Sequence, residues 1–149
     1  MTYNFKLLPE FTMLSELRKN LEDIFNKENL FDDLTRKNIL LAVTELFINI
    51  VEHGQVSQNK FVKFHIKRKS SSFELTLLDE GNSYDPLNIK LPDISELPEH
   101  GFGLFLIDSL MDSFEYFPKD RNYTYNTNKI TKKIEMWGMK NDNNSHENK

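Results

Sequence analysis

Residues 99–112 read EHGFGLFLIDSLMD, in which two glycines separated by one residue lead into an amphipathic apolar segment. We expect a helix from about Gly103 to Ser113 that opens at these glycines. The first turn of a helix carries unpaired N–H groups and partial positive charge, and glycine lets a phosphate come close to the backbone. The segment predicts a phosphate-binding turn, with a plain glycine-rich turn before a packed helix as the alternative.

Composition narrows the class of protein. The chain has 149 residues, a formal net charge of −4 and no cysteine. Its length predicts one domain, and its negative charge argues against nucleic acid as the main partner. Without cysteine, disulfides, thiolate zinc sites and cysteine nucleophiles are excluded. No apolar run approaches the ~18–20 residues of a membrane span, and the N-terminus lacks a secretory pattern, so we expect a cytoplasmic protein.

The order of the predicted elements defines the expected fold. Apolar spacing predicts strands near residues 3–8, 61–66, 73–78, 114–117 and 129–137, and helices over 11–25, from Asp32 or Asp33 to His53, and over 103–113. Most strands are hairpin-connected. We therefore expect an α+β two-layer sandwich with a mixed, mostly antiparallel sheet and the helices on one face. Residues 1–137 would form this domain, and the polar residues 138–149 a disordered tail.

The helix that ends at His53 carries a polar stripe on an otherwise apolar surface. Glu45 and Asn49 lie four residues apart, and Glu52 and His53 follow on the same side. One interpretation is the solvated face of a packed helix. The other is a functional pair, because an asparagine oxygen suits Mg²⁺ and a carboxylate one turn away can orient or deprotonate a nucleophile.

An acidic turn follows the strand predicted at residues 73–78. Asp79 ends an apolar run, where a carboxylate is costly to bury unless it is paired. The exocyclic amine of a ligand would satisfy it, and Gly81 would let that ligand approach the backbone. The alternative is an ordinary Asp–Gly turn with no ligand.

Taken together and in this order, the three segments resemble a known pattern. AVTELFINIVEHG (42–54), LLDEGNSYDP (77–86) and HGFGLFLIDSLMDSFEY (100–116) are similar to the helix motif, adenine-site turn and glycine box of the GHKL (Bergerat-fold) ATP-binding superfamily. Within it, the chain most resembles the anti-sigma-factor serine kinases, over about residues 5–137. The resemblance implies a histidine-kinase-like ATPase domain with ATP and Mg²⁺ as cofactors.

The resemblance also implies roles for individual residues. Asn49 would hold Mg²⁺ against the phosphates, and Glu45 would be the general base for a substrate serine. Asp79 would bind the adenine amino group, Gly81 would line the adenine pocket, and Thr131 would join Asp79 through a water molecule.

Gly101, Phe102 and Gly103 would bind phosphates through the backbone. The implied protein is an anti-sigma factor that phosphorylates an anti-anti-sigma partner, binds a sigma factor and forms a homodimer through its first strand and helix, without contact to nucleic acid or membrane. Two departures support a non-catalytic binding module as the alternative. Ser83 stands where the family often has glycine or proline, and Lys90 is the only Lys or Arg between Gly81 and Gly101.

Overall fold

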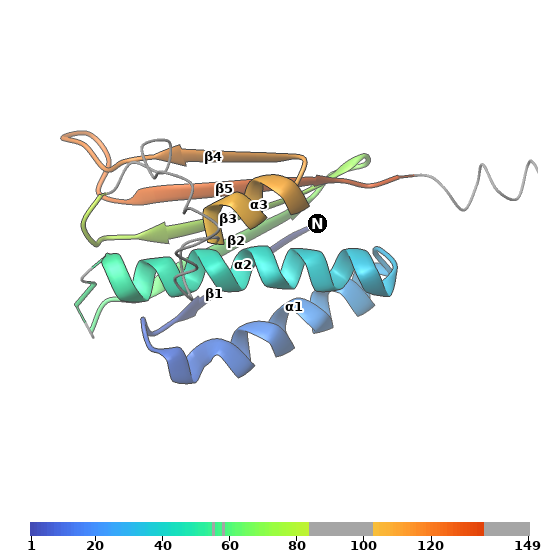
Figure 1. The fold of residues 1–149 in the computed structure, drawn as a ribbon, viewed down its shortest axis with the longest axis horizontal. Helices are drawn as coiled ribbons and strands as arrows, with labels where there is room; N and C mark the ends of the chain where they lie inside the picture. Colours follow the sequence, from blue (N-terminus) through green and yellow to red (C-terminus); the bar gives the residue numbers. More distant parts are fainter. Residues whose placement is uncertain (55, 58, 84–102, 136–149) are drawn as a thin grey trace, which may run out of the picture.

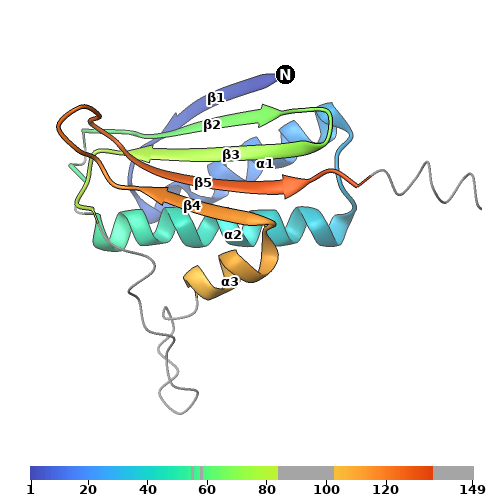
Figure 2. The ribbon, with the colours of Figure 1, turned by 90° about the horizontal axis from the view of Figure 1, so that it is seen from above.

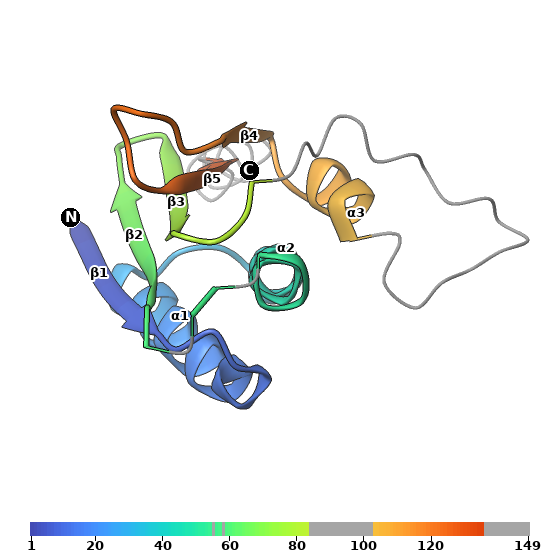
Figure 3. The ribbon, with the colours of Figure 1, turned by 90° about the vertical axis from the view of Figure 1, so that its left-hand side faces the viewer.

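The computed structural model describes residues 1–54, 56–57, 59–83 and 103–135. These residues form two layers, a five-stranded sheet and a layer of helices against one of its faces (Figure 1; Figure 3). The expected α+β sandwich with helices on one face is therefore confirmed.

The sheet is antiparallel throughout its described pairs. Its order is β1-β2-β3-β5-β4 (Figure 2). The strands are β1 (Thr2–Leu7), β2 (Val62–Arg68), β3 (Ser72–Asp79), β4 (Ser113–Phe117) and β5 (Asn126–Lys133). Because β5 returns between β3 and β4, the end of β3 and the start of β5 lie at the same end of the sheet.

The helical layer begins with a short 3-10 turn, η1 (Phe11–Met13), that leads into α1 (Leu14–Glu28). Next comes α2 (Asp33–His53), which begins at an Asp32 cap and ends at Gly54, as predicted. The Asp32 carboxylate accepts a hydrogen bond from the backbone N–H of Thr35 at 2.8 Å. The third helix, α3 (Gly103–Leu110), packs against α2 on the side away from α1 (Figure 3).

The loop between α1 and α2 is held by Arg36. Its guanidinium donates to the carbonyl oxygens of Leu30 and Phe31 at 2.6 and 3.0 Å and to the Asn26 side chain at 2.8 Å. Phe31 has a φ of 62°, a left-handed conformation that a bulky residue adopts only where its surroundings enforce it. The Arg36 hydrogen bonds and the edge-on contact of the Phe31 ring with Phe25 supply that restraint.

The core between the layers is rich in phenylalanine. Four phenylalanine rings are fully buried, one each from α1, α2, β2 and β3: Phe25, Phe47, Phe64 and Phe73. Such side chains each bury a large apolar area, which is the main favourable contribution to folding. The sheet therefore supports α2 along its length and fixes the position of the polar residues near the end of that helix.

Several predicted boundaries are displaced by three or four residues: α1 spans Leu14–Glu28 rather than 11–25, and the last strand ends at Lys133 rather than 137. The last strand begins at Asn126 rather than Lys129. Asn126 and Asn128 suggest a loop in the sequence, but both are buried in β5. The helix predicted over 103–113 ends at Leu110, since the N–H of Asp112 donates to Thr131 of β5 at 3.0 Å and the chain has already joined the sheet. Trp137 and the predicted tail lie outside the described residues.

Candidate functional site

The C-terminal end of α2 touches the turn that follows β3. The N–H of Asn82 donates to the carbonyl oxygen of Gly54 at 2.5 Å. A Cβ atom on Gly81 would lie 2.2 Å from that same oxygen, closer than real contacts allow. Gly81 is therefore a position of close backbone approach, and the group that approaches it is the end of α2 at Gly54. The approach of a ligand to Gly81 stays a prediction. This contact brings the acidic turn and the polar stripe of α2 to one end of the molecule.

Asp79 is buried at this end, with 2% of its surface exposed. Its Oδ1 atom accepts hydrogen bonds from the N–H of Gly81 at 2.9 Å and from the side chain of Asn126 at 3.1 Å. Burial raises the pKa of the Asp79 carboxyl, and these hydrogen bonds and the charge of Lys119 oppose that shift. Within the described part of the chain Oδ2 receives no hydrogen bond, so this oxygen is available to a ligand.

The structure adds Asn126, which the sequence reasoning missed. It lies directly opposite Asp79 at the start of β5 and is 1% exposed. Its amide nitrogen donates to Asp79 and to the carbonyl of Gly81, while its oxygen accepts from Ser83 at 2.6 Å and from the N–H of Lys119 at 2.9 Å. Ser83, a departure from the family pattern, thus has a partner inside the turn. The only sequence signal was an asparagine beside a predicted strand.

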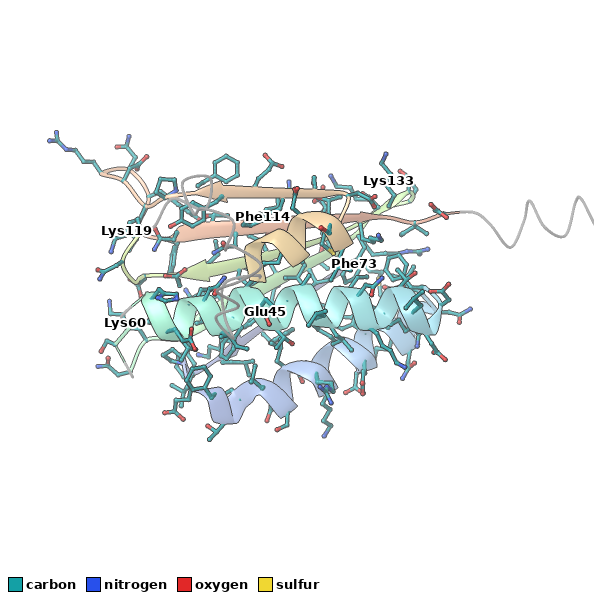
Figure 4. All side chains as sticks on the ribbon, in the orientation of Figure 1. Glu45, Lys60, Phe73, Phe114, Lys119 and Lys133 are labelled. Carbon is teal, nitrogen blue, oxygen red and sulfur yellow. The ribbon has the colours of Figure 1, made fainter. Side chains whose placement is uncertain are left out.

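The polar stripe of α2 is not a uniformly solvated face. Asn49 is buried, with 8% exposed, whereas Glu52 and His53 near the helix end are exposed. Glu45 is half-buried and lies midway along α2 (Figure 4). The described residues give the Asn49 side chain no hydrogen-bond partner. A nearly buried carboxamide of this kind suits a ligand that binds through its oxygen.

The stripe also has an axial order. At about 1.5 Å per residue, Asn49 lies about 7.5 Å along α2 from Gly54, and Glu45 about 13.5 Å. Moving away from the Asp79 turn, the polar groups are therefore the buried carboxylate of Asp79, the buried amide of Asn49 and the half-buried carboxylate of Glu45. An elongated ligand with its head at Asp79 would pass Asn49 before it reached Glu45.

Thr131 does not join this cluster. It pairs with Glu74, five residues along β3 from Asp79, which at about 3.4 Å per residue is about 17 Å away. Its side chain also points to the opposite face of the sheet, because Asp79 and Glu74 differ by an odd number of residues. A water molecule cannot bridge Thr131 and Asp79, so the role expected for Thr131 is wrong. Asn126 occupies the place that Thr131 was expected to fill.

The glycine box lies partly outside the described residues. Gly103 opens α3, as predicted, and α3 packs against α2. Gly101 and Phe102 are not among the described residues. The described side chains form no group of three or more His, Asp or Glu residues that could hold a metal ion. A single oxygen donor from Asn49 fits Mg²⁺ bound mainly through the phosphates of a nucleotide, which is how this ion is commonly held.

Among the described residues, no helix is both long enough and apolar enough to cross a membrane.

Known proteins share sequence similarity and the fold with this chain. The serine-protein kinase RsbW of Staphylococcus aureus, in strains MRSA252 and Newman, is 28% identical over 134 residues, which cover 83% of this chain and 82% of the relative.

Two solved structures share the fold. The RsbU and RsbW domains of a Mycobacterium tuberculosis protein match with a TM-score of 0.67 at 14% identity, over 90% of this chain and 32% of theirs, so this chain spans about a third of that protein. A blue-light activated histidine kinase of Erythrobacter litoralis matches with a TM-score of 0.54 at 13% identity, over 83% of this chain and 60% of its own. Both likenesses concern the fold alone.

The family model of the histidine kinase-like ATPase domain matches residues 7–130, a range that holds the polar stripe of α2, the Asp79 turn and the glycine box. The predicted family is confirmed, and this chain belongs to the histidine kinase-like ATPase domain family.

Proposed function

We propose that this chain is an anti-sigma regulatory factor with ATP-dependent serine protein kinase activity toward an anti-anti-sigma protein. The observation that carries the proposal is the order of three side chains along the axis of α2: Asp79 at its C-terminal end, then Asn49, then Glu45 midway along the helix. The similarity to the S. aureus serine-protein kinase RsbW supports the choice of serine as the acceptor.

ATP would bind with its adenine at the Asp79 turn. The exocyclic amine would donate to Oδ2 of Asp79, and Gly81 would line the pocket. The phosphates would extend along α2 toward Asn49, where the backbone of Gly101, Phe102 and Gly103 would complete their binding. A helix N-terminus such as that of α3 favours such an anion because of its free N–H groups.

Asn49 and Glu45 would divide the phosphoryl transfer between them. Asn49 would hold Mg²⁺ against the phosphates, and the ion supplies neutralisation of charge when it is bound. Glu45 lies one helical turn farther from the adenine end, where the γ-phosphate and the substrate serine would meet. Its carboxylate would accept the hydroxyl proton as the serine oxygen bonds to phosphorus and the bond to the β–γ bridging oxygen breaks, releasing ADP.

The kinase is tested by transfer of labelled phosphate from ATP to candidate anti-anti-sigma proteins of the same genome. We expect transfer by the wild type and at least a 100-fold lower rate for Glu45→Gln, in line with loss of a general base. ATP affinity, measured by calorimetry, should change little. Glu52→Gln makes the same change at an exposed position of α2 and should transfer normally.

Each outcome has a separate meaning. Equal transfer by Glu45→Gln and the wild type would remove Glu45 as the base. ATP binding by the wild type without transfer to any candidate would overturn the kinase, and absence of ATP binding at millimolar nucleotide would overturn the whole proposal.

We also propose a homodimer that forms through β1 and α1. β1 is an edge strand of the sheet. Met1 and Arg68 exchange backbone hydrogen bonds, so by antiparallel alternation the N–H and C=O groups of Thr2, Asn4 and Lys6 point away from β2. Such an edge can pair with a second copy. Light scattering should give a dimer for wild type and Asn4→Ala and a monomer for Asn4→Pro; a dimeric Asn4→Pro would rule out edge pairing.

A further inference from the structure

Asn126 forms four hydrogen bonds at the Asp79 end, and all four are within the described residues. Two are made by the amide nitrogen and two by the amide oxygen. A reversed amide would put the nitrogen against the Ser83 hydroxyl and the Lys119 N–H and the oxygen against two acceptors. The network therefore allows one orientation, in which the nitrogen faces Asp79.

This orientation controls how the Asp79 carboxylate is presented. The Asn126 nitrogen and the Gly81 N–H both donate to Oδ1, at 3.1 and 2.9 Å. Rotation of the carboxylate would break both hydrogen bonds in a buried setting, which is costly. Oδ1 is therefore held by the protein, which leaves Oδ2 as the oxygen that a ligand can bind.

The hydrogen bonds of Asn126 also connect segments that are far apart in the sequence. Lys119, in the loop between β4 and β5, donates its backbone N–H to Asn126 and its side-chain ammonium to the carbonyl of Glu80 at 3.2 Å. Figure 4 shows Lys119 at the end of the molecule that also holds Lys60, with Lys133 at the opposite end. Asn126 thus joins the start of β5 and the loop before it to the turn that carries Gly81 and Ser83.

We propose that Asn126 is a positioning residue that sets the specificity of this site for a purine with a 6-amino group. It acts through Asp79: by occupying Oδ1, it directs Oδ2 at the amine. This inference rests on the proposed ATP site, and it adds a determinant from β5 that no sequence motif contained.

The test compares the affinities for ATP and for purine riboside triphosphate, which carries hydrogen in place of the 6-amino group. We expect the wild type to bind ATP at least tenfold more tightly, as the gain of one hydrogen bond to a charged group implies. In Asn126→Ala this ratio should fall to about threefold or less. A merely structural role would weaken both nucleotides equally and leave the ratio unchanged.

Two further variants keep the test decisive. Asn128→Ala removes another buried asparagine two residues along the same face of β5, opposite Leu77, and should retain the wild-type ratio. Ser83→Ala removes one donor to the Asn126 oxygen and should lower the ratio about two- to threefold, so it serves if Asn126→Ala does not fold.

A full ratio in folded Asn126→Ala, or a full ratio in Ser83→Ala where Asn126→Ala does not fold, would overturn the inference while leaving the ATP site intact. A ratio that falls equally in Asn128→Ala would also overturn it. A wild type that binds neither nucleotide would overturn the proposed function first, and a wild type that binds both equally would remove the role of Asp79.

Discussion

Replacing Asp79 with asparagine separates stability from ligand binding, because binding should weaken while stability holds or rises. The substitution keeps the size of the side chain. Its Oδ1 atom can still accept from the Gly81 N–H and from Asn126, the two hydrogen bonds that hold the carboxylate. The new amide nitrogen must then stand where Oδ2 was, because the reverse orientation would point it at two donors.

Binding should weaken strongly. The carboxylate loses a charge-assisted hydrogen bond to the adenine amine, and a donor now faces a donor. One such bond and one unsatisfied buried group together amount to about 2–4 kcal/mol, or about 30- to 700-fold in ATP affinity. Stability of the free protein should hold or rise, because the raised pKa of Asp79 means that the fold favours the neutral carboxyl over the ionised one.

The pH dependence gives a second check on the same residue. A carboxyl whose pKa is higher in the folded state than the ordinary 3.8 binds more protons when folded. Its contribution to stability is therefore present in full below that value and is lost as the pH rises through the folded-state pKa. The stability advantage of Asp79→Asn should accordingly be absent in acid and grow over that interval.

Calorimetry with ATP and urea unfolding of the free protein measure the two effects. Glu80→Gln is the matched control, since it makes the same chemical change one residue away, at a side chain paired with Lys60 on the surface. It should leave ATP affinity unchanged. ATP binding by Asp79→Asn within threefold of the wild type would refute the role of Asp79. If Asp79→Asn loses more than about 1 kcal/mol of stability at neutral pH, burial does not outweigh hydrogen bonding at the Asp79 carboxylate.

Three further substitutions test the framework of the site. Gly81→Ala puts a Cβ 2.2 Å from the Gly54 oxygen and should cost about 1–3 kcal/mol, seen as a melting temperature several degrees lower; an unchanged melting temperature would contradict this packing. Asp32→Ala should destabilise α2 at neutral pH, and less so in acid. The hydrogen bond from Thr35 lowers the pKa of Asp32, so the wild type itself loses this cap as the pH falls through the folded-state pKa. A difference in urea midpoint between variant and wild type that stays the same at every pH would contradict this. Arg36→Lys should lose about 1–3 kcal/mol in urea unfolding, since an ammonium cannot reproduce the forked hydrogen bonds, and a wild-type midpoint would argue against them.

The sequence predicted those parts of the molecule that depend on local chemistry. Apolar spacing, the Asp32 cap and Gly54 define α2 because caps and helical periodicity act within a few residues. The start of β5 could not be found in this way. Asn126 disfavours a strand by propensity, and its place there depends on partners 43 and 47 residues away, Ser83 and Asp79.

The role predicted for Thr131 was wrong for a related reason. Its expected role depended on register, and a strand position differing by an odd number of residues lies on the other face of the sheet. The pairing of β3 with β5 is a tertiary property that no local pattern in either strand specifies. Polar residues on one face of a single helix could therefore be grouped from the sequence, whereas the residue that completes the Asp79 cluster from another strand could not.

Ser83 and Asn126 are best understood as parts of one structural feature. The Ser83 hydroxyl donates to the Asn126 oxygen, and Asn126 in turn donates to Asp79 and to the carbonyl of Gly81. Glycine or proline at position 83 would offer no hydroxyl, and a threonine at position 126 would offer no second donor. Relatives that have glycine or proline at position 83 should therefore have a residue other than asparagine at position 126. They should do so more often than relatives that have serine at position 83. Aligned sequences in which the two positions vary independently would contradict this coupling, and with it the view that the departure at Ser83 compensates for a different residue beneath the turn.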